Sequence, residues 1–355
     1  MAWIALLGAG TLMVLTAMPW LRSGWWVIRV CDFPRAHLCI AGLIGSLACL
    51  GLLIAGEQGW ETITAAGLFV FVAIVQAVYV TQFLPLWPNS VADASGGDRI
   101  RLLVSNLDYE NAQRDEAARW LEHIEVDLLV LVEVDEEWML ALDRVRGQYA
   151  HHLEAVRPEG LGLVLWSKLP LADATVEHLV TEERPSLHAR VQLREGRSIA
   201  INALHPTPPG LDREQDGRED SRKRDAELVI LAKRIAEDPG TDRLVVGDLN
   251  DAAWSHTTRL FLRLSGMLDP RRGRGMFSTY PASKPLLRYP IDHVFVSEGF
   301  RVGGLRREIA PGSDHLAMFA DLSLTTKEGV SPDPKPADHE NGAEIVRDGQ
   351  KDTAE

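Results

Sequence analysis

Apolar residues are distributed very unevenly along this chain of 355 residues. Three stretches near the N-terminus, residues 2–20, 38–55 and 63–82, are dominated by apolar residues and contain no charged side chain. Each stretch is about long enough to cross the ~30 Å hydrocarbon core of a bilayer as a helix. Tryptophans flank the stretches, as aromatic residues do at membrane interfaces. The pattern therefore predicts a membrane region over residues 1–84 with three transmembrane helices.

Two alternatives exist for these apolar stretches. The first stretch has the length of a signal peptide, but no Lys or Arg stands at its start. All three could also be buried helices of a soluble protein, and their length argues against that interpretation.

The rest of the chain divides by composition into a linker, a folded domain and a tail. Residues 85–97 contain two prolines and two glycines, which predicts a linker. A folded domain is expected over residues 98–325. Residues 326–355 are rich in Pro, Asp, Glu and Lys and have no aromatic residue, so this tail is predicted to be disordered.

Within the folded domain, short apolar runs with β-branched residues are interspersed with segments of helical periodicity. The predicted strands are residues 100–105, 126–132, 161–166, 199–204, 244–247, 294–296 and 317–322. The predicted helices are residues 112–124 and 221–237. Many strands with few helices predict an α/β sandwich, and the sequence contains no internal repeat.

Charge and cysteine content limit the partners of this domain. The chain has a formal net charge of −13, and residues 1–97, with three arginines against four acidic residues, account for only −1 of it. The remaining −12 makes the domain a poor general binder of polyanions. All three cysteines lie in the apolar N-terminal third, which excludes disulfides and thiolate metal sites from the domain.

Chemically capable polar residues recur at the ends of the predicted strands. They are Asn106, Glu133, His205, Asp248, Asn250, Asp292, Asp314 and His315. Each one alone is typical of a cap or turn residue. Together they offer hard oxygen ligands and imidazoles without a thiolate, which favours Mg²⁺, Mn²⁺ or Ca²⁺. Histidines near such a metal can polarise a phosphate or move protons, so the set fits attack of water on a phosphoester.

The motifs that carry these residues resemble those of the endonuclease/exonuclease/phosphatase family. In chain order they read NL with Asn106, DLLVLVEV with Glu133, GLGLVLWSKLPL, NALHP with His205, GDLND with Asp248 and Asn250, YPIDHVFVS with Asp292, and GSDHLAMFA with Asp314 and His315. The resemblance covers about residues 98–325. It implies a four-layer α-β-β-α sandwich, in which two packed mixed sheets are flanked by helices.

The resemblance also implies a role for each residue. Glu133 corresponds to the metal-binding glutamate, Asn106 to the asparagine that supports the metal or phosphate, and Asp314 to an acid that can reach the metal. Asp248 corresponds to the residue that orients or deprotonates the attacking water. Asn250 corresponds to its neighbour that holds the phosphate. The implied metal is Mg²⁺ or Mn²⁺.

Two histidines have implied roles at the phosphate. His315 corresponds to the histidine that contacts the scissile phosphate, and Asp292 to the aspartate that orients and charges it. His205 corresponds to a second phosphate-side residue. Glu183 is a candidate acidic partner for a histidine, although a surface glutamate before a turn is the more ordinary interpretation. His293, next to Asp292, is expected to be an ordinary strand residue.

Three arginines between Asp269 and the motif TYP are candidates for substrate binding. Arg271, Arg272 and Arg274 could grip a phosphate or head group, or could form a solvated loop. The chain has no extended basic stretch with interleaved aromatic residues of the kind that follows a nucleic acid backbone. Nucleic acid is therefore a possible substrate that charge does not favour.

The orientation in the membrane has two conflicting indications. The first loop, residues 21–37, holds three arginines, and counting Lys and Arg puts this loop and the C-terminal domain in the cytoplasm. The motifs HPTPPG and TYP resemble a membrane-anchored bacterial subgroup whose catalytic domain faces outside the cytoplasm. Because a bias of three residues is small, the expectation is a multi-pass protein of the plasma or inner membrane with an extracytoplasmic domain.

Two classes of function fit these observations. The first is a membrane-anchored, divalent-metal-dependent hydrolase of phosphoester bonds. The second is a non-catalytic, membrane-tethered binding module on the same fold. Within the first class, nuclease, lipid phosphodiesterase and phosphatase stay open, because the shared residues act on the phosphate and not on its substituents. The sequence indicates no protein partner.

Overall fold

Three long apolar helices form the N-terminal part of the computed structural model, which describes residues 1–208, 220–325 and 331–351. The segments long and apolar enough to cross a membrane are Ala2–Leu21, Arg35–Ile54 and Trp60–Phe83. They contain helices α1 (Ala2–Ala17), α3 (Arg35–Ile54) and α4 (Trp60–Val80) and the short 3₁₀ helices η1 (Met18–Leu21) and η3 (Thr81–Phe83). Large apolar side chains on these helices are exposed, as lipid-facing residues are.

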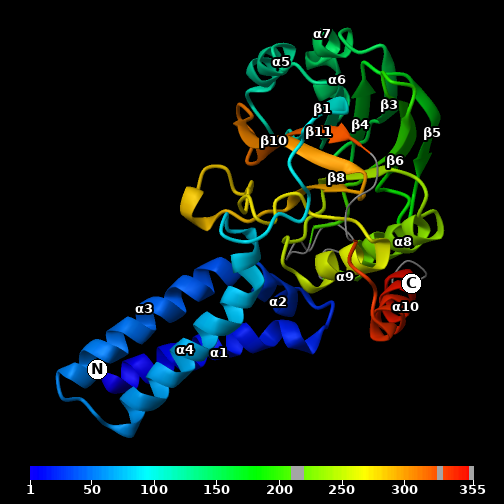
Figure 1. Ribbon diagram of the computed structural model, residues 1–355. Helices are drawn as coiled ribbons and strands as arrows, with labels where there is room; N and C mark the ends of the chain where they lie inside the picture. Colours follow the sequence, from blue (N-terminus) through cyan, green and yellow to red (C-terminus); the bar gives the residue numbers. More distant parts are fainter. Residues whose placement is uncertain (209–219, 326–330, 352–355) are drawn as a thin grey trace.

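The three helices form a bundle that projects from the rest of the molecule. The N-terminus and the turn between α3 and α4 lie at the far end of the bundle (Figure 1). Helices α3 and α4 approach closely at Gly42, where an added Cβ would lie 2.9 Å from the backbone nitrogen of Ala73. Small residues at such crossings let helix backbones pack tightly in a membrane. The bundle therefore has one end free and one end against the folded domain.

The folded domain contains two sheets. The first has the strand order β10-β11-β1-β2-β4-β3, and the second has the order β5-β6-β7-β8-β9. The strands of the first sheet are β1 (Asp98–Asn106), β2 (Leu128–Val132), β3 (His151–Ala155), β4 (Leu163–Ser167), β10 (Phe300–Ile309) and β11 (Leu316–Leu324). Those of the second are β5 (Leu171–Glu177), β6 (Ser186–Gln192), β7 (Ser198–Ala203), β8 (Arg243–Asp248) and β9 (Asp292–Val296). Each sheet contains one parallel pair, β1–β2 or β7–β8, among antiparallel pairs.

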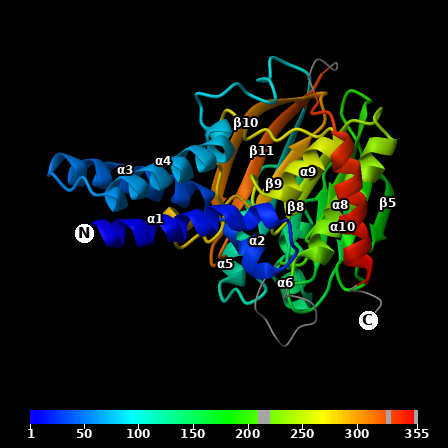
Figure 2. The ribbon, with the colours of Figure 1, turned by 90° about the horizontal axis from the view of Figure 1, so that it is seen from below.

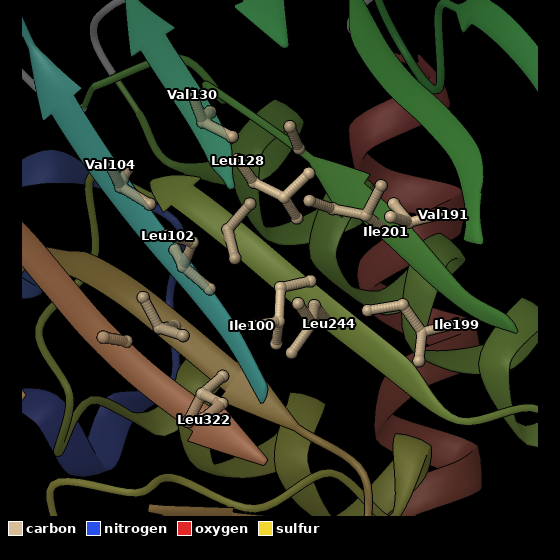
Figure 3. Packing of buried hydrophobic residues seen from close by; sticks show 14 of the residues in the cluster. Ile100, Leu102, Val104, Leu128, Val130, Val191, Ile199, Ile201, Leu244 and Leu322 are labelled. Atoms are coloured by element: carbon tan, nitrogen blue, oxygen red, sulfur yellow. The ribbon is translucent and has the colours of Figure 1, made fainter. Parts of the chain in front are cut away.

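The two sheets pack face to face around a core that follows from the period of two in each strand. Ile100, Leu102 and Val104 of β1 point toward the second sheet, where Leu244 and Val246 of β8 meet them (Figure 3). The alternate residues of the same strands point outward into two further apolar clusters beneath the helices. Because both faces of the central strands are covered, these strands read as near-continuous apolar runs in the sequence.

Helices cover the outer face of each sheet. Helices α5 (Arg114–Glu122), α6 (Glu136–Ala141) and α7 (Asp143–Arg146) lie over the first sheet, and α8 (Arg222–Glu237) and α9 (His256–Ser265) over the second. The predicted four-layer α-β-β-α sandwich is confirmed. The helices predicted at residues 112–124 and 221–237 correspond to α5 and α8.

The C-terminal segment differs from the prediction of a disordered tail over residues 326–355. Residues Pro336–Lys351 form helix α10, which lies beside α8 and α9 (Figure 2). Arg263 of α9 forms an ion pair with Asp338 at 2.8 Å, and Ile345 and Val346 pack onto the apolar cluster of α8 and α9. Composition missed this helix because its few apolar residues find their partners only in the folded domain. The remaining residues of the predicted tail that lie outside the described part are 326–330 and 352–355.

The segment between α1 and α3 fixes the N-terminal helices to the sandwich. It contains α2 (Trp26–Arg29) and the 3₁₀ helix η2 (Val30–Asp32). The buried guanidinium of Arg29 donates to Asp225 at the start of α8 and forms a further ion pair with Asp32 at 3.6 Å. The indole of Trp254 donates to the carbonyl of Asp32 at 2.7 Å. This contact brings the membrane region next to the strand ends described below.

Candidate active site

The strand registers bring the predicted residues to one edge of the sandwich. Strands β8 and β9 are antiparallel, and their pairing sets Asp248 directly opposite Asp292. Strands β1 and β2 are parallel, so Asn106 at the end of β1 lies beside Val132, which Glu133 follows. The carboxyl ends of parallel strands are a common place for ligand sites. The ends of six strands, β1, β2, β7, β8, β9 and β11, thus carry the residues that the sequence predicted.

His315 is held between two aspartates. Its Nδ1 lies 2.8 Å from Oδ2 of Asp292, and its Nε2 lies 3.7 Å from Oδ2 of Asp248. Burial alone lowers the pKa of His315, but the attraction of Asp292 and Asp248 outweighs burial and raises the pKa to about 10. The backbone nitrogen of His315 donates to Ser313, whose hydroxyl donates to the carbonyl of Asn106 at 2.7 Å. The motif GSDH thereby ties a protonated imidazole to the end of β1.

Asp248 is a buried carboxylate with few charge partners. Burial, together with the nearby carboxylate of Asp292, raises the pKa of Asp248 to about 7. The side-chain amide of Asn106 donates to Oδ2 of Asp248 at 3.1 Å, and the backbone nitrogen of Asn250 donates to Oδ1 at 2.9 Å. A carboxylate that changes protonation near neutral pH is suited to general base catalysis.

The glycine before Asp248 is required by close packing. Gly247 has a φ of +140°, and a Cβ built there would lie 1.9 Å from the carbonyl oxygen of Leu204. Strand β7 therefore approaches β8 too closely for any other residue at this position. The motif GDLND thus combines a glycine that close packing requires, Gly247, with a reactive carboxylate, Asp248.

Glu133 follows β2 in a left-handed conformation, with a φ of +65°. Non-glycine residues in this region are uncommon and often occur at functional sites. Its carboxylate accepts hydrogen bonds from the side chain of Asn106 at 2.9 Å and the backbone of Tyr109 at 3.1 Å. Burial outweighs these hydrogen bonds and raises the pKa of Glu133. A cation beside this carboxylate would offset the cost of its burial.

His205 also lies near Glu133: its Nε2 is 3.9 Å from Oε1 of Glu133, the same oxygen that accepts from Asn106. Arg184 donates to the backbone carbonyl of His205 at 3.2 Å and lies 3.4 Å from its Nδ1. Glu183, the acid that the sequence offered as a partner, is exposed. Arg184, the residue that follows Glu183, contacts His205 instead, so this segment offers the histidine a cation rather than an acid.

Asn250 and Asp314 complete the predicted set. Asn250 has a φ of +51°, and its side-chain amide donates to the carbonyl of Pro206 at 3.0 Å. Asp314 has a half-exposed side chain whose carboxylate lies 3.9 Å from Nε2 of His315. Both residues line the cavity described below.

The residues fit a hard divalent cation. Glu133 offers a carboxylate at the cavity, and the buried Oδ1 of Asp292 has no hydrogen-bond partner among the described residues. Ligand atoms of Asp248, Asp292 and His315 also lie within 4.8 Å of one another and could hold an ion. In that second arrangement a metal on Nδ1 of His315 would replace its hydrogen bond to Asp292, whereas a metal on Nε2 would leave this bond intact. Glu133 and Asp314, two of the three ligands expected from the resemblance, line the cavity, and the third, Asn106, donates to Glu133.

The three arginines predicted to bind substrate do not line the cavity, so this assignment is corrected. Arg271 is buried, forms an ion pair with Asp269 at 2.8 Å and donates to the carbonyl of Asp292 at 3.2 Å. Arg274 donates to the carbonyl of Val91 at 2.6 Å, and Arg272 lies in the same turn with a buried Nε that has no hydrogen-bond partner among the described residues. Arg271 and Arg274 thus support the loop that precedes β9. Sequence reasoning identified a cluster of cations but not the contacts that occupy Arg271 and Arg274.

His293 has no contact with the cavity, in agreement with the prediction. Arg271 donates to its Nδ1 at 2.7 Å, and its Nε2 lies 2.8 Å from the carbonyl of Asp251. Burial, with the charge of Arg271, lowers the pKa of His293 to about 3. The imidazole is a neutral structural group of β9.

A cavity of about 670 Å³ is lined by six of the eight predicted groups, all except Asn106 and Asp292, and by several residues that the sequence did not indicate. Tyr109, Arg184 and Tyr280 line it, and the rings of Tyr280 and His315 are 4.8 Å apart. Its other wall comes from the N-terminal helices and the segment between α1 and α3, with Leu15, Trp26, Val30, Phe33 and Pro34. These residues carried no chemical signal in the sequence, because their position depends on docking between segments far apart in the chain.

Fold and site together define a sandwich protein with a His–Asp pair and a carboxylate cluster at the strand ends. The model described as "Endonuclease/Exonuclease/phosphatase family" matches residues 102–315, and the chain belongs to that family. No curated protein matches the chain in sequence.

Three solved structures illustrate the shared fold. D. rerio TDP2 humanized by 14 mutations has a TM-score of 0.52 and 15% identity, covering 64% of this chain and 100% of that one. The human nocturnin catalytic domain with bound sulfate has a TM-score of 0.51 and 15% identity, covering 68% and 100%. The endonuclease/exonuclease/phosphatase from Bacteroides vulgatus has a TM-score of 0.50 and 17% identity, covering 64% and 99%. At these identities the likeness shows the fold alone.

Proposed function

We propose that the chain is a membrane-anchored hydrolase of phosphoester bonds that depends on a divalent metal. The observation that carries this proposal is the arrangement of His315 between Asp292 and Asp248 at one end of the cavity. A protonated imidazole faces a carboxylate that can accept a proton near neutral pH. Family membership supports phosphoester hydrolysis as the reaction class.

In the proposed reaction, Asp248 orients a water molecule and takes its proton as the water attacks phosphorus. Its raised pKa of about 7 makes the carboxylate a stronger base than an exposed aspartate. The amide of Asn106 holds one oxygen of Asp248, and the backbone of Asn250 holds the other. These two contacts fix the direction from which the water approaches.

The imidazolium of His315 stabilises the negative charge that develops on the phosphoryl oxygens. Asp292 keeps this imidazole charged and oriented. Asn250 and His205, which also line the cavity, serve as further donors to phosphate oxygens. A Mg²⁺ or Mn²⁺ ion held by Glu133, Asn106 and Asp314 would neutralise the same oxygens. Arg184 takes the place of Arg271, Arg272 and Arg274 as the cavity-lining cation in this proposal.

The alternative is a binding module without catalysis on the same fold. Such a module could bind a phosphate with a histidine alone and would gain nothing from the buried carboxylates. Asp248 and Asp292 lie in one cross-strand pair, and the protonated imidazole of His315 lies between them and offsets their repulsion. A buried carboxylate at Asp248 whose pKa stays near neutral beside that imidazole is suited to proton transfer, and this supports the enzyme.

A substrate panel tests the proposed function. The full-length chain should be assayed with soluble phosphodiesters and monoesters, phospholipid, and single- and double-stranded DNA, at fixed salt with and without Mg²⁺. We expect metal-dependent hydrolysis of at least one class, and weak DNA cleavage because the C-terminal part carries −12. Hydrolysis of none with either metal would contradict the proposal. Duplex DNA cleaved far faster than the rest, with a steep salt dependence, would instead identify a nuclease.

The membrane orientation belongs to the proposal as well. Of the three arginines that favour a cytoplasmic domain, Arg29 and Arg35 are buried in ion pairs with Asp225 and Asp32. Because these two have structural roles, only Arg22 remains as an orientation signal, and we propose an extracytoplasmic domain. Protease added to intact cells, after any outer membrane is opened, should then remove the domain. Complete protection until lysis would contradict this orientation.

A further inference from the structure

The cavity has two chemically different walls. One wall contains the charged groups of the strand ends, with Asp248 and His315 among them. The other is apolar and consists of Leu15 from α1, Trp26 from α2, and Val30, Phe33 and Pro34 from the turns that follow. A site built only for a soluble ionic substrate gains nothing from such a wall, because its apolar surface is left against water.

The apolar wall is continuous with the membrane helices. Leu15 lies two residues before the end of α1, and Pro34 immediately precedes α3. Figure 1 shows α2 between the domain-facing ends of the helix bundle and the sandwich, and Figure 2 shows the same contact from below. The apolar wall therefore begins at the membrane-proximal end of the molecule and ends at the catalytic groups.

The wall is fixed in place by contacts that do not depend on substrate. Arg29 is bonded to Ser221 at 3.0 Å and to Asp225, and both partners belong to the start of α8. The ring of Phe33 packs edge-on against Tyr289 with centroids 5.6 Å apart. Because the membrane region and the sandwich are locked together here, the cavity that they share is a built feature of the fold.

We propose, on the basis of the proposed function, that the substrate is a membrane lipid that carries a phosphoester. Its phosphate reaches Asp248 and His315, and its apolar chain stays along Leu15, Trp26 and Val30. To reach the catalytic groups, the lipid then has to move out of the bilayer only by the depth of its head group. This arrangement also explains how an acidic domain obtains a phosphate-bearing substrate without an extended basic surface.

The test uses a series of alkyl phosphates and two adjacent tryptophans. Trp26 lines the cavity, whereas Trp25 is 54% exposed and does not. Trp25→Gln and Trp26→Gln therefore remove equivalent interfacial side chains, and only Trp26→Gln alters the wall. Binding of ethyl, butyl, hexyl and octyl phosphate to the full-length chain in lipid nanodiscs is measured by calorimetry, with empty discs subtracted.

We expect affinity to rise with chain length in the wild type and in Trp25→Gln, by up to about four-fold for each methylene that becomes buried. Trp26→Gln should weaken octyl phosphate at least about ten-fold relative to Trp25→Gln and leave ethyl phosphate nearly unchanged. Val30→Asn, at a side chain that is 48% exposed, tests the wall again without disturbing packing. Equal binding of all four phosphates by the wild type, or equal slopes for the two tryptophan variants, would overturn the inference.

The same preparations separate this inference from the proposed function. Hydrolysis of soluble bis(4-nitrophenyl) phosphate without any dependence of binding on chain length would overturn the lipid inference alone. Binding that follows chain length, in a chain that hydrolyses no phosphoester, would support lipid recognition and overturn the proposed reaction.

Discussion

Two clusters of charged residues in this molecule differ in how their charges are balanced. The docking cluster joins the membrane region to α8 and the turn after β8, and it contains Arg29, Arg35, Arg224, Asp32, Asp225 and Asp251. Each of its arginines has an aspartate partner. The active-site cluster contains Glu133, Asp248, Asp292, Asp314 and His315, so its carboxylates outnumber its cation.

Asp225 of the docking cluster and Asp248 of the active-site cluster differ in the direction of their pKa shifts. Burial alone raises the pKa of Asp225, but Arg29 and Arg224 outweigh burial and lower it. In Asp248, burial and the charge of Asp292 act together and raise the pKa to about 7. The paired carboxylate of Asp225 is therefore held as an anion, whereas the carboxylate of Asp248 beside the cavity is able to bind a cation or a proton.

Removal of metal should have the largest effect and should act on the active-site cluster alone. EDTA should abolish hydrolysis, and Mg²⁺ or Mn²⁺ should restore it, because the excess carboxylates require a cation. Glu133→Gln should raise the Mg²⁺ concentration for half-maximal rate by about ten-fold or more. The assay is the rate of bis(4-nitrophenyl) phosphate hydrolysis against metal concentration. Full activity in excess EDTA would refute metal dependence.

Substitutions of the residues that accept or hold protons should have the second-largest effect on the rate of hydrolysis. Asp248→Asn and His315→Ala should each lower kcat by about 10²-fold or more, which is typical of general bases and charge-stabilising groups. Glu183→Gln is the matched control, since Glu183 is exposed and close in sequence to the cavity residue Arg184, and it should change kcat less than about two-fold. A near-normal rate in either active-site variant would reject the role assigned to that residue.

Breaking the docking cluster should change stability rather than chemistry. Arg29→Met leaves Asp225 and Asp32 each with one arginine fewer in a buried site, at a cost of about 3 kcal/mol. Thermal unfolding in nanodiscs should show a lower melting temperature, and kcat for the soluble diester measured well below that temperature should be nearly unchanged. A loss of kcat as large as that of His315→Ala would show that the two clusters are not separate.

The pH dependence of the rate should report the unbalanced cluster. Asp248 acts as its carboxylate, so the rate should rise about ten-fold per pH unit below its pKa of about 7 and then level off. His315 acts as its cation, so the rate should fall as pH rises through about 10. The measurement is kcat/KM for the soluble diester from pH 5 to pH 11. A profile with no inflection near neutral pH would contradict the assignment of Asp248 as the base.

The sequence predicted much of this fold because apolar runs and polar strand ends are local signals. The spans, most of the strands, helices α5 and α8, and the convergence of Asn106, Glu133, Asp248 and His315 all follow from such patterns. Strand β10, which pairs with β11, was missed because its burial alternates poorly and its sequence, FRVGGLRREI, contains four charged residues and two glycines. Helix α10 was missed because its stability comes from tertiary contacts.

What sequence reasoning could not supply was the partner of each charge. Arg29 and Arg271 are both apparent as cations in the sequence, yet one closes an interface and the other supports β9. Arg184, which does line the cavity, was overlooked beside Glu183. Charge neutralisation depends on contacts between distant segments, and only the folded chain brings those segments together.

One measurement tests the central claim, that water activated at Asp248 attacks phosphorus beside His315. The full-length chain with Mg²⁺ is given bis(4-nitrophenyl) phosphate in ¹⁸O-labelled water, and both products are analysed by mass spectrometry. The account predicts one ¹⁸O in the phosphoryl product and none in nitrophenol, with release lowered about 10²-fold or more in Asp248→Asn. Label in nitrophenol, or release no faster than in buffer with either Mg²⁺ or Mn²⁺, would contradict it.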